Sequence, residues 1–200
     1  MTMGEPHDGA RALQVRLGYV FANQSLLGEA LTHRSAVNHK TNGRKRAQAK
    51  GAGSNERLEF IGDRVLGLLM AEWLLERYPS EQEGALGSRL AHLVSRTTLA
   101  GIAERIDMPD ALTVAAHEAK AGVRTAANVL ADALEAVLGA VFLDGGLDPA
   151  RKIVRLCWTP ELDAQARPPK DPKTALQEWV LGRGQALPVY ETIGADGPSH

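Results

Sequence analysis

Apolar residues recur at helical spacing along most of the chain, in blocks separated by short polar, glycine or proline breaks. The longest block runs from about Asn55 to Tyr78 and stops at Pro79, because the residue before a proline disfavours the helical conformation. Its middle, residues 65–75, is apolar almost all round apart from Glu72, which is typical of a helix at the centre of a bundle. The pattern therefore predicts a mainly helical domain built around this segment.

Shorter helices are expected on both sides of that central segment, with Ser25 as a candidate N-cap for one of them. The expected helices cover residues 11–17, 25–33, 86–95, 97–106, 125–142, 149–158 and 174–183. From 37 to 54 the periodicity is lost, which indicates a mobile loop. This loop is basic and contains Arg44, Lys45, Arg46 and Lys50.

Prolines mark a boundary toward the end of the chain. Residues 160–172 contain four prolines and little that can pack, so they are typical of a linker. The helix over 174–183 and an alternating, strand-like segment at 189–193 follow, and one helix with one strand cannot bury a core of their own. We expect three parts. They are a helical domain over 1–159, a linker over 160–170 and an incomplete second module over 171–200.

Acidic residues in the apolar helices carry the candidate chemistry. At about 100° per residue, Glu56, Glu59 and Asp63 fall within about 60° of one another on the long helix. Asp132 and Glu135 lie three residues apart in a second apolar helix. Carboxylates are rare in buried helices unless a cation compensates them, and clustered oxygens suit Mg²⁺ or Mn²⁺. The pattern predicts one divalent-metal site shared by two helices.

Small residues on both helices favour the close approach that such a site needs, because Mg²⁺ holds its ligands at about 2.0–2.1 Å. They are Gly62 and Gly67 on the first helix and Ala133, Ala136, Gly139 and Ala140 on the second. The opposing interpretation is a solvated acidic helix face, which stays open above all for Glu56, near its helix start.

Composition narrows the class of protein. The formal charge of −1 and the pI near 6.6 argue against a simple electrostatic nucleic-acid binder, although a local basic patch remains compatible with them. Cys157 is alone, which excludes a disulfide framework and a cysteine-type zinc site. No apolar run approaches the roughly 20 residues that span a bilayer, and residues 1–10 lack an apolar signal core. We expect a cytoplasmic protein without a membrane partner.

Four stretches resemble the ribonuclease III family of double-stranded-RNA endonucleases. Residues 55–65, NERLEFIGDRV, resemble its signature, and residues 31–35, LTHRS, resemble its upstream segment. Residues 129–136 and 171–178 resemble its second acidic motif and the opening of its double-stranded-RNA-binding domain. The resemblance implies an all-α, ribonuclease III-like helical bundle, followed by a linker and the start of an α-β-β-β-α RNA-binding module.

The resemblance also implies roles for individual residues. The residues that match the family's metal ligands are Glu59, Asp132 and Glu135. Asp63 matches a catalytic carboxylate, as does Glu135 in a second capacity, whereas Glu56 matches a less critical acidic position. Glu83 matches a position near the partner subunit, with an exposed loop glutamate as the alternative. The positions that match RNA contacts of the second module are Thr174, Gln177, Glu178 and His200.

The implied activity is Mg²⁺-dependent hydrolysis of double-stranded RNA by a homodimer, with Mn²⁺ as a substitute. It leaves 5′-phosphate and 3′-hydroxyl ends and serves ribosomal-precursor, messenger and transfer RNA processing. Two other classes of protein also gather carboxylates or bind RNA. A di-iron bundle normally carries Glu-x-x-His pairs, which neither acidic helix has. An RNA-binding regulator with a degenerate site is opposed by the presence of all four key carboxylates.

Overall fold

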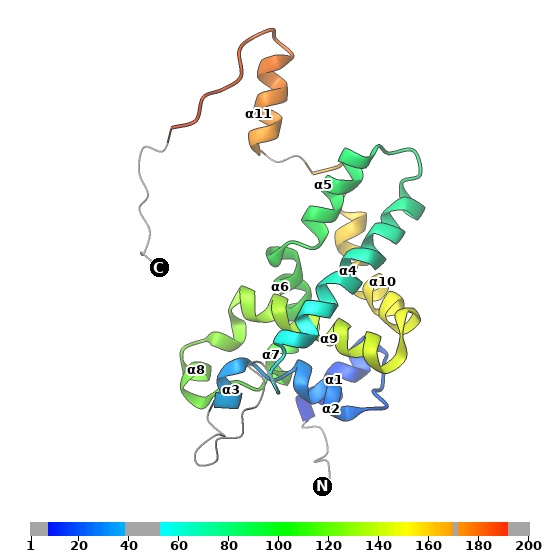
Figure 1. The fold of residues 1–200 in the computed structure, drawn as a ribbon, viewed down its shortest axis with the longest axis vertical. Helices are drawn as coiled ribbons and strands as arrows, with labels where there is room; N and C mark the ends of the chain where they lie inside the picture. The colour runs from blue at the N-terminus through cyan, green and yellow to red at the C-terminus, as the bar shows by residue number, and fades with distance from the viewer. Residues whose placement is uncertain (1–7, 39–52, 170–171, 192–200) are drawn as a thin grey trace.

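The computed structural model describes residues 8–38, 53–169 and 172–191, and the chain within these ranges is helical (Figure 1). In chain order the elements are α1 (Asp8–Leu17), α2 (Gln24–Ala30), α3 (Arg34–Asn38), α4 (Glu56–Arg77), α5 (Glu83–Leu93), α6 (Arg96–Arg105), α7 (Met108–Ala111), α8 (Ala116–Lys120), the 3₁₀ turn η1 (Val123–Thr125), α9 (Ala127–Gly145), α10 (Leu147–Asp163) and α11 (Pro172–Leu181). Within the described ranges the extended chain pairs only at an isolated parallel bridge, Thr32 with Thr113. The expected all-α fold class is confirmed.

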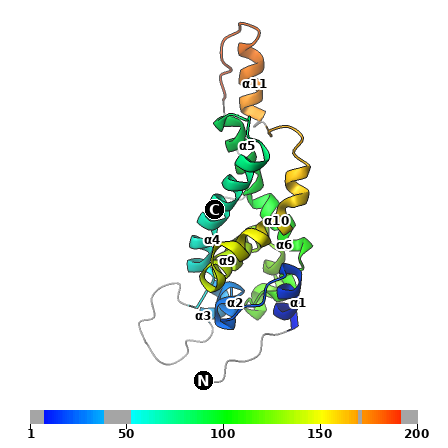
Figure 2. The same cartoon turned by 90° about the vertical axis from the view of Figure 1, so that its right-hand side faces the viewer.

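Helices α4 and α9 form the centre of the fold and pack on each other more extensively than any other pair of elements. Helices α2, α6 and α10 pack around α9, and both views show them gathered about it (Figures 1 and 2). Helix α9 is buried on nearly all sides between Val129 and Val141. Helix α4 is enclosed on one side only, since Leu68 and Leu75 on its other side are 58% and 61% exposed. The sequence pattern alone predicted that α4 lies inside the bundle, whereas apolar side chains such as Leu68 and Leu75 lie on its outer side.

Two glycines allow α4 and α9 to touch backbone to backbone. A Cβ added to Gly62 would lie closer than 3.0 Å to the carbonyl oxygen of Glu135, and one on Gly139 equally close to the carbonyl oxygen of Leu58. Real Cβ atoms essentially never show such separations, so only glycine fits at either position. Gly67, expected to serve the same end, has no neighbour within 4 Å of its would-be Cβ. The close approach is therefore confined to one crossing point.

Ion pairs fasten α10 to the second half of α4. Arg151 Nε lies 2.7 Å from a carboxylate oxygen of Glu72, and an Arg155 nitrogen lies 2.5 Å from Glu76.

No helix in the described part of the chain is long and apolar enough to cross a bilayer.

Several expected boundaries shift. The N-cap of α2 is Asn23, whose side chain accepts a hydrogen bond from the backbone N–H of Ser25, so the expected Ser25 cap is wrong. Helix α10 continues through Pro160 to Asp163, past the expected start of the linker. Buried Trp158 and Leu162, four residues apart on one face, hold this turn against the core despite the proline.

Other expected elements differ from the structure or lie partly outside the described residues. Residues 189–191 form no strand, and 192–193 lie outside the described ranges. The basic residues Arg44, Lys45, Arg46 and Lys50 also lie outside them. Helix α3 extends into the stretch expected to be a loop, as far as Asn38.

Candidate active site

Carboxylates from α4 and α9 flank the glycine crossing. Gly62 follows Glu59 by three residues and directly precedes Asp63, and the carbonyl group that it approaches belongs to Glu135. Asp132 lies about one turn before Glu135 on α9. All four acids are half-buried, between exposed and core positions. We call Glu59, Asp63, Asp132 and Glu135 the acidic cluster.

Burial disfavours the charged forms of Glu59, Asp132 and Glu135, and neighbouring carboxylates add to the effect at Glu59 and Glu135. Burial raises the pKa of Glu135 to about 7, with further increases from the negative charges of Asp63, Glu59 and Asp132. Burial likewise raises the pKa of Glu59, and Asp132, Glu56 and Asp63 add to the effect. Burial also raises the pKa of Asp132. A buried group whose charge is so strongly disfavoured is ready to receive a cation.

Arginines offset part of this negative charge. Arg64 pairs with Asp63 and opposes the raised pKa of Glu135. Arg96, at the start of α6, opposes the raised pKa of Asp132. Arg34, at the start of α3, opposes the raised pKa of both Glu59 and Asp132. No motif or spacing in the sequence singles out Arg96, whereas Arg34 lies in the LTHRS stretch.

The donor set suits a hard divalent cation. It offers carboxylate oxygens from two helices, which are the ligands of Mg²⁺ and Mn²⁺. Among the described residues no three acidic, histidine or cysteine side chains converge closely enough to enclose an ion together. The carboxylates nevertheless share one electrostatic environment, since Glu135 is influenced by each of the other three. The chemistry of the donors and their shared excess of negative charge therefore fit a divalent metal.

The remaining predicted residues lie apart from the acidic cluster, except for Glu56. Glu56 is exposed at the start of α4, accepts a hydrogen bond from Ser54 Oγ at 3.1 Å, and raises the pKa of Glu59. Glu83 opens α5 beyond the opposite end of α4, where it lines an apolar hollow of about 250 Å³ with Leu75 and Leu86. Gln177 and Glu178 lie on α11, past the far end of α5 (Figure 1). His200 and the side chain of Thr174 lie outside the described set.

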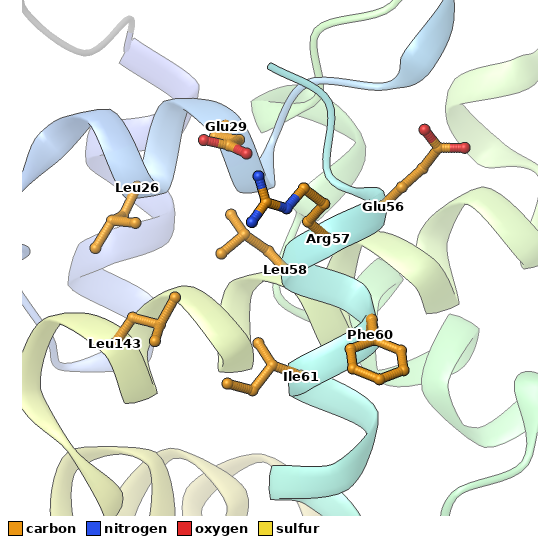
Figure 3. Close-up of a pocket in the computed structure, with 8 residues that line it drawn as sticks. All are labelled: Leu26, Glu29, Glu56, Arg57, Leu58, Phe60, Ile61 and Leu143. Carbon is orange, nitrogen blue, oxygen red and sulfur yellow. The ribbon is translucent and has the colours of Figure 1, made fainter. Parts of the chain in front are cut away.

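A larger hollow of about 730 Å³ lies beside the start of α4. Its lining residues are Leu26, Glu29, Glu56, Arg57, Leu58, Phe60, Ile61 and Leu143 (Figure 3). Figure 3 shows the aliphatic side chains facing this space and the Glu56 carboxylate pointing away from it. Because none of the acidic cluster lines this hollow, it is a separate, mainly apolar site between α2, α4 and the end of α9.

Comparisons with known proteins point to a single group. A family model described as ribonuclease-III-like matches residues 23–162. The chain is 45% identical to the ribonuclease 3 of Caulobacter vibrioides over 189 residues, which are 94% of this chain and 78% of the relative. It is 41% identical to the ribonuclease 3 of Rhodopseudomonas palustris over 191 residues, 96% of this chain and 67% of that protein.

Solved structures agree with the sequence relatives. The nuclease domain of ribonuclease III from Campylobacter jejuni, studied for flexibility in a region involved in dimer formation, superposes with a TM-score of 0.64 at 34% identity. That match covers 74% of this chain and 95% of the other. Dicer from Pichia stipitis matches with a TM-score of 0.52 at 23% identity, over 90% of this chain and 77% of that one, which shows a shared fold.

Proposed function

The chain belongs to the ribonuclease III family, and we propose that its acidic cluster is the site at which it cleaves double-stranded RNA. It is an endoribonuclease with a divalent-metal requirement. The observation that carries the assignment of the site is the α4–α9 crossing at Gly62, where the backbone of Glu135 meets α4 between Glu59 and Asp63.

In this proposal Glu59, Asp132 and Glu135 hold the metal, with Mg²⁺ as the working ion and Mn²⁺ as a substitute. When bound, the ion supplies charge stabilisation to the phosphate oxygens and lowers the pKa of a water molecule. Asp63 is the catalytic carboxylate that orients the attacking water and accepts its proton. Water adds to phosphorus and the 3′ oxygen departs with a proton, which leaves 5′-phosphate and 3′-hydroxyl ends.

The raised pKa of Glu135 supports its double assignment as ligand and catalytic group. A carboxyl group with a pKa of about 7 exchanges its proton for a cation near neutral pH at little cost. Glu56, exposed and one turn before Glu59, tunes that residue from outside the cluster.

The decisive experiment follows cleavage of a long RNA duplex on a gel, with Mg²⁺ and with EDTA. We expect short duplex products with Mg²⁺ only. Glu135→Gln should lower the cleavage rate at least roughly 100-fold, since several kcal/mol of metal-dependent stabilisation are lost, while RNA binding is kept. Glu104→Gln, an exposed glutamate on α6, is the matched control. Binding without cleavage by the wild-type protein would instead identify an RNA-binding regulator.

The exposed apolar side of α4 supports a homodimer. Phe60, Leu68 and Leu75 are 66%, 58% and 61% exposed, and their spacings of eight and seven residues align them along one face. Arg64 lies over the Phe60 ring, 4.5 Å from its centroid, on the same face. A row of large apolar side chains on a surface marks a protein interface, and we propose that a second copy covers it.

Light scattering tests the dimer. Leu68→Ser should shift the protein from dimer to monomer at micromolar concentration. Leu156→Ser is the matched control, because Leu156 is also 58% exposed but lies on α10. Equal masses for the two variants would remove the α4 face from the interface.

We further propose that residues of the C-terminal module, Thr174, Gln177, Glu178 and His200, contact the RNA duplex. Double-stranded RNA is read through its shape, phosphates and 2′-hydroxyl groups, so these contacts add affinity without sequence preference. Ribosomal-precursor, messenger and transfer RNAs in the cytoplasm are the proposed substrates.

A further inference from the structure

The segment 31–35 is hydrogen-bonded through its backbone both to the residue before α4 and to the chain between α7 and α8. On one side the backbone N–H of Asn55, directly before α4, donates to the carbonyl oxygen of Thr32 at 2.9 Å. On the other side the N–H of His33 donates to the carbonyl of Thr113 at 2.9 Å, and the N–H of Thr113 donates to the carbonyl of Leu31 at 2.8 Å. The segment therefore ties the start of α4 to the chain that leads through α8 into α9.

Side chains reinforce the same junction. His33 Nδ1 lies 2.9 Å from Ser35 Oγ and 3.3 Å from a carboxylate oxygen of Glu118 on α8. Ser35 Oγ also accepts a hydrogen bond from the backbone N–H of Ala115 at 3.1 Å. The neighbouring Ser35 hydroxyl and the charge of His33 lower the pKa of Glu118. We call His33, Ser35 and Glu118 the clasp.

Arg34 sits between two clasp residues, yet its own side chain is exposed. Among the described residues it takes part in no ion pair. Thr32, two residues before Arg34, accepts the hydrogen bond from Asn55, which lies four residues before Glu59, so Arg34 stands at the end of α4 that carries the acidic cluster. In keeping with this position, its positive charge opposes the raised pKa of Glu59 and of Asp132. Arg64, by contrast, is already paired with Asp63.

A phosphate group needs such a cation at this place. The acidic cluster repels the RNA backbone, and a fixed guanidinium beside it offsets that repulsion for a neighbouring phosphate. Arginine suits the task because its planar donors match phosphate oxygens in pairs.

We propose that Arg34 binds a backbone phosphate of the RNA duplex next to the acidic cluster, and that the clasp positions it there. The inference rests on the proposed function, since it names a substrate contact of the same site. Arg34 is a binding residue, and Glu118, which acts through it, is a positioning residue.

The test measures duplex-RNA affinity of the full chain in EDTA at several salt concentrations, and steady-state cleavage in Mg²⁺. Arg34→Gln should weaken binding roughly 10-fold and lower the slope of log affinity against log salt by about 1, the value of one lost phosphate contact. It should raise KM with kcat within about threefold, because ground-state and transition-state binding are lost alike. Arg34→Lys should keep the salt slope.

Lys152→Gln is the matched control. It removes one exposed positive charge on α10, away from the acidic cluster, and should leave slope and KM unchanged. If Arg34→Gln and Lys152→Gln behave alike, or if Arg34→Gln lowers kcat and leaves the salt slope intact, the phosphate contact is refuted.

Glu118→Ala tests the clasp. It should raise KM about threefold to fivefold in the wild-type background and have no further effect in the Arg34→Gln background, because it acts through Arg34. If the effects of Glu118→Ala and Arg34→Gln on KM multiplied in the double variant, the positioning role would be refuted. Circular dichroism checks that each variant is folded.

The two proposals fail in different ways. A wild-type chain that does not cut duplex RNA in Mg²⁺ overturns the proposed function. A wild-type chain that cuts normally, together with an unchanged salt slope for Arg34→Gln, overturns the inference about Arg34 alone.

Discussion

The protonation of Glu135 links the site to the stability of the fold. Its pKa is raised to about 7 in the folded protein by burial and by three neighbouring carboxylates, so the folded state binds this proton more tightly than the unfolded state. The stabilisation that this gives is fully present below the ordinary glutamate pKa and is lost as the pH rises toward 7. Without metal, the wild-type protein should therefore lose stability across this range.

Glu135→Gln should remove the loss of stability at rising pH, because glutamine does not ionise. In EDTA at pH 8 we expect its Tm to exceed the wild-type value by roughly 3 °C or more, with the difference vanishing near pH 4.5. Millimolar Mg²⁺ should raise the wild-type Tm more than that of the variant, because the ion binds only the folded state. Thermal melts between pH 4.5 and pH 8 measure the Tm difference between the two proteins. A Tm difference that grows as the pH falls would contradict the expected direction of the effect.

A second prediction at the scale of residues concerns the buried ion pair of Arg89 and Glu81, away from the acidic cluster. Its side chain is 1% exposed, donates to both carboxylate oxygens of Glu81 at 2.7 and 2.8 Å, and donates to the carbonyl of Gln165 at 2.7 Å. Its guanidinium also lies 3.8 Å from the centroid of the Tyr78 ring. The loss of unfolding free energy depends on which partner is removed. Without Glu81, Arg89 stays charged and buried with no carboxylate to balance it.

We expect Glu81→Ala to cost about 3 kcal/mol of unfolding free energy, and Arg89→Met only about 1–2 kcal/mol. Glu76→Ala, which breaks the more exposed pair with Arg155, is the control and should cost less than about 1 kcal/mol. Urea denaturation measures all three, and a larger loss for Arg89→Met than for Glu81→Ala would contradict the argument.

The acidic cluster could be predicted from residue spacing, because helical periodicity determines which side chains share a face. Glu59 and Asp63 had to lie together, and Asp132 and Glu135 likewise. The positions of Arg34 and Glu118 could not be read in the same way. They are 84 positions apart in the sequence, and their segments meet through tertiary contacts such as the bridge between residues 32 and 113.

At the scale of elements, the crossing of α4 and α9 depends on two glycines and not on the third. Gly62→Ala should destabilise the protein by about 3 kcal/mol and weaken its response to Mg²⁺, because the added methyl group pushes the acidic helices apart. Gly67→Ala is the matched control on the same helix. Its Cβ meets open space, so it should stabilise the fold by about 0.5–1 kcal/mol. Equal effects in thermal melts would refute the crossing geometry.

Periodicity placed the helices, and tertiary packing moved their ends. Helix α10 passes Pro160 because Leu162 is buried beyond it, a contact that local propensity does not contain. The apolar face of α4 was read as core, since a pattern of residues does not distinguish burial within a chain from burial against a second copy. Small residues predicted the close helix contact, but the structure shows that Gly62 forms it and Gly67 does not.

At the scale of the whole molecule, the hydrophobic core ends on α10. Every residue of its buried cluster lies between Ala10 and Leu162, while Trp179 and Leu181 on α11 are more than half exposed. Both views show α11 beyond the end of α5 (Figures 1 and 2). The catalytic part should thus fold without the residues that follow it.

A chain ending at Pro169 should melt within about 2 °C of the full chain, because no core residue is removed. It should cut saturating duplex RNA at a similar kcat but with a higher KM, since the proposed contacts of the C-terminal module are lost. A chain ending at Leu156 is the control. It lacks buried Trp158 and Leu162 and should not fold cooperatively. If the chain ending at Pro169 melted more than about 5 °C lower, α11 would belong to the catalytic fold, and the division at the linker would be wrong.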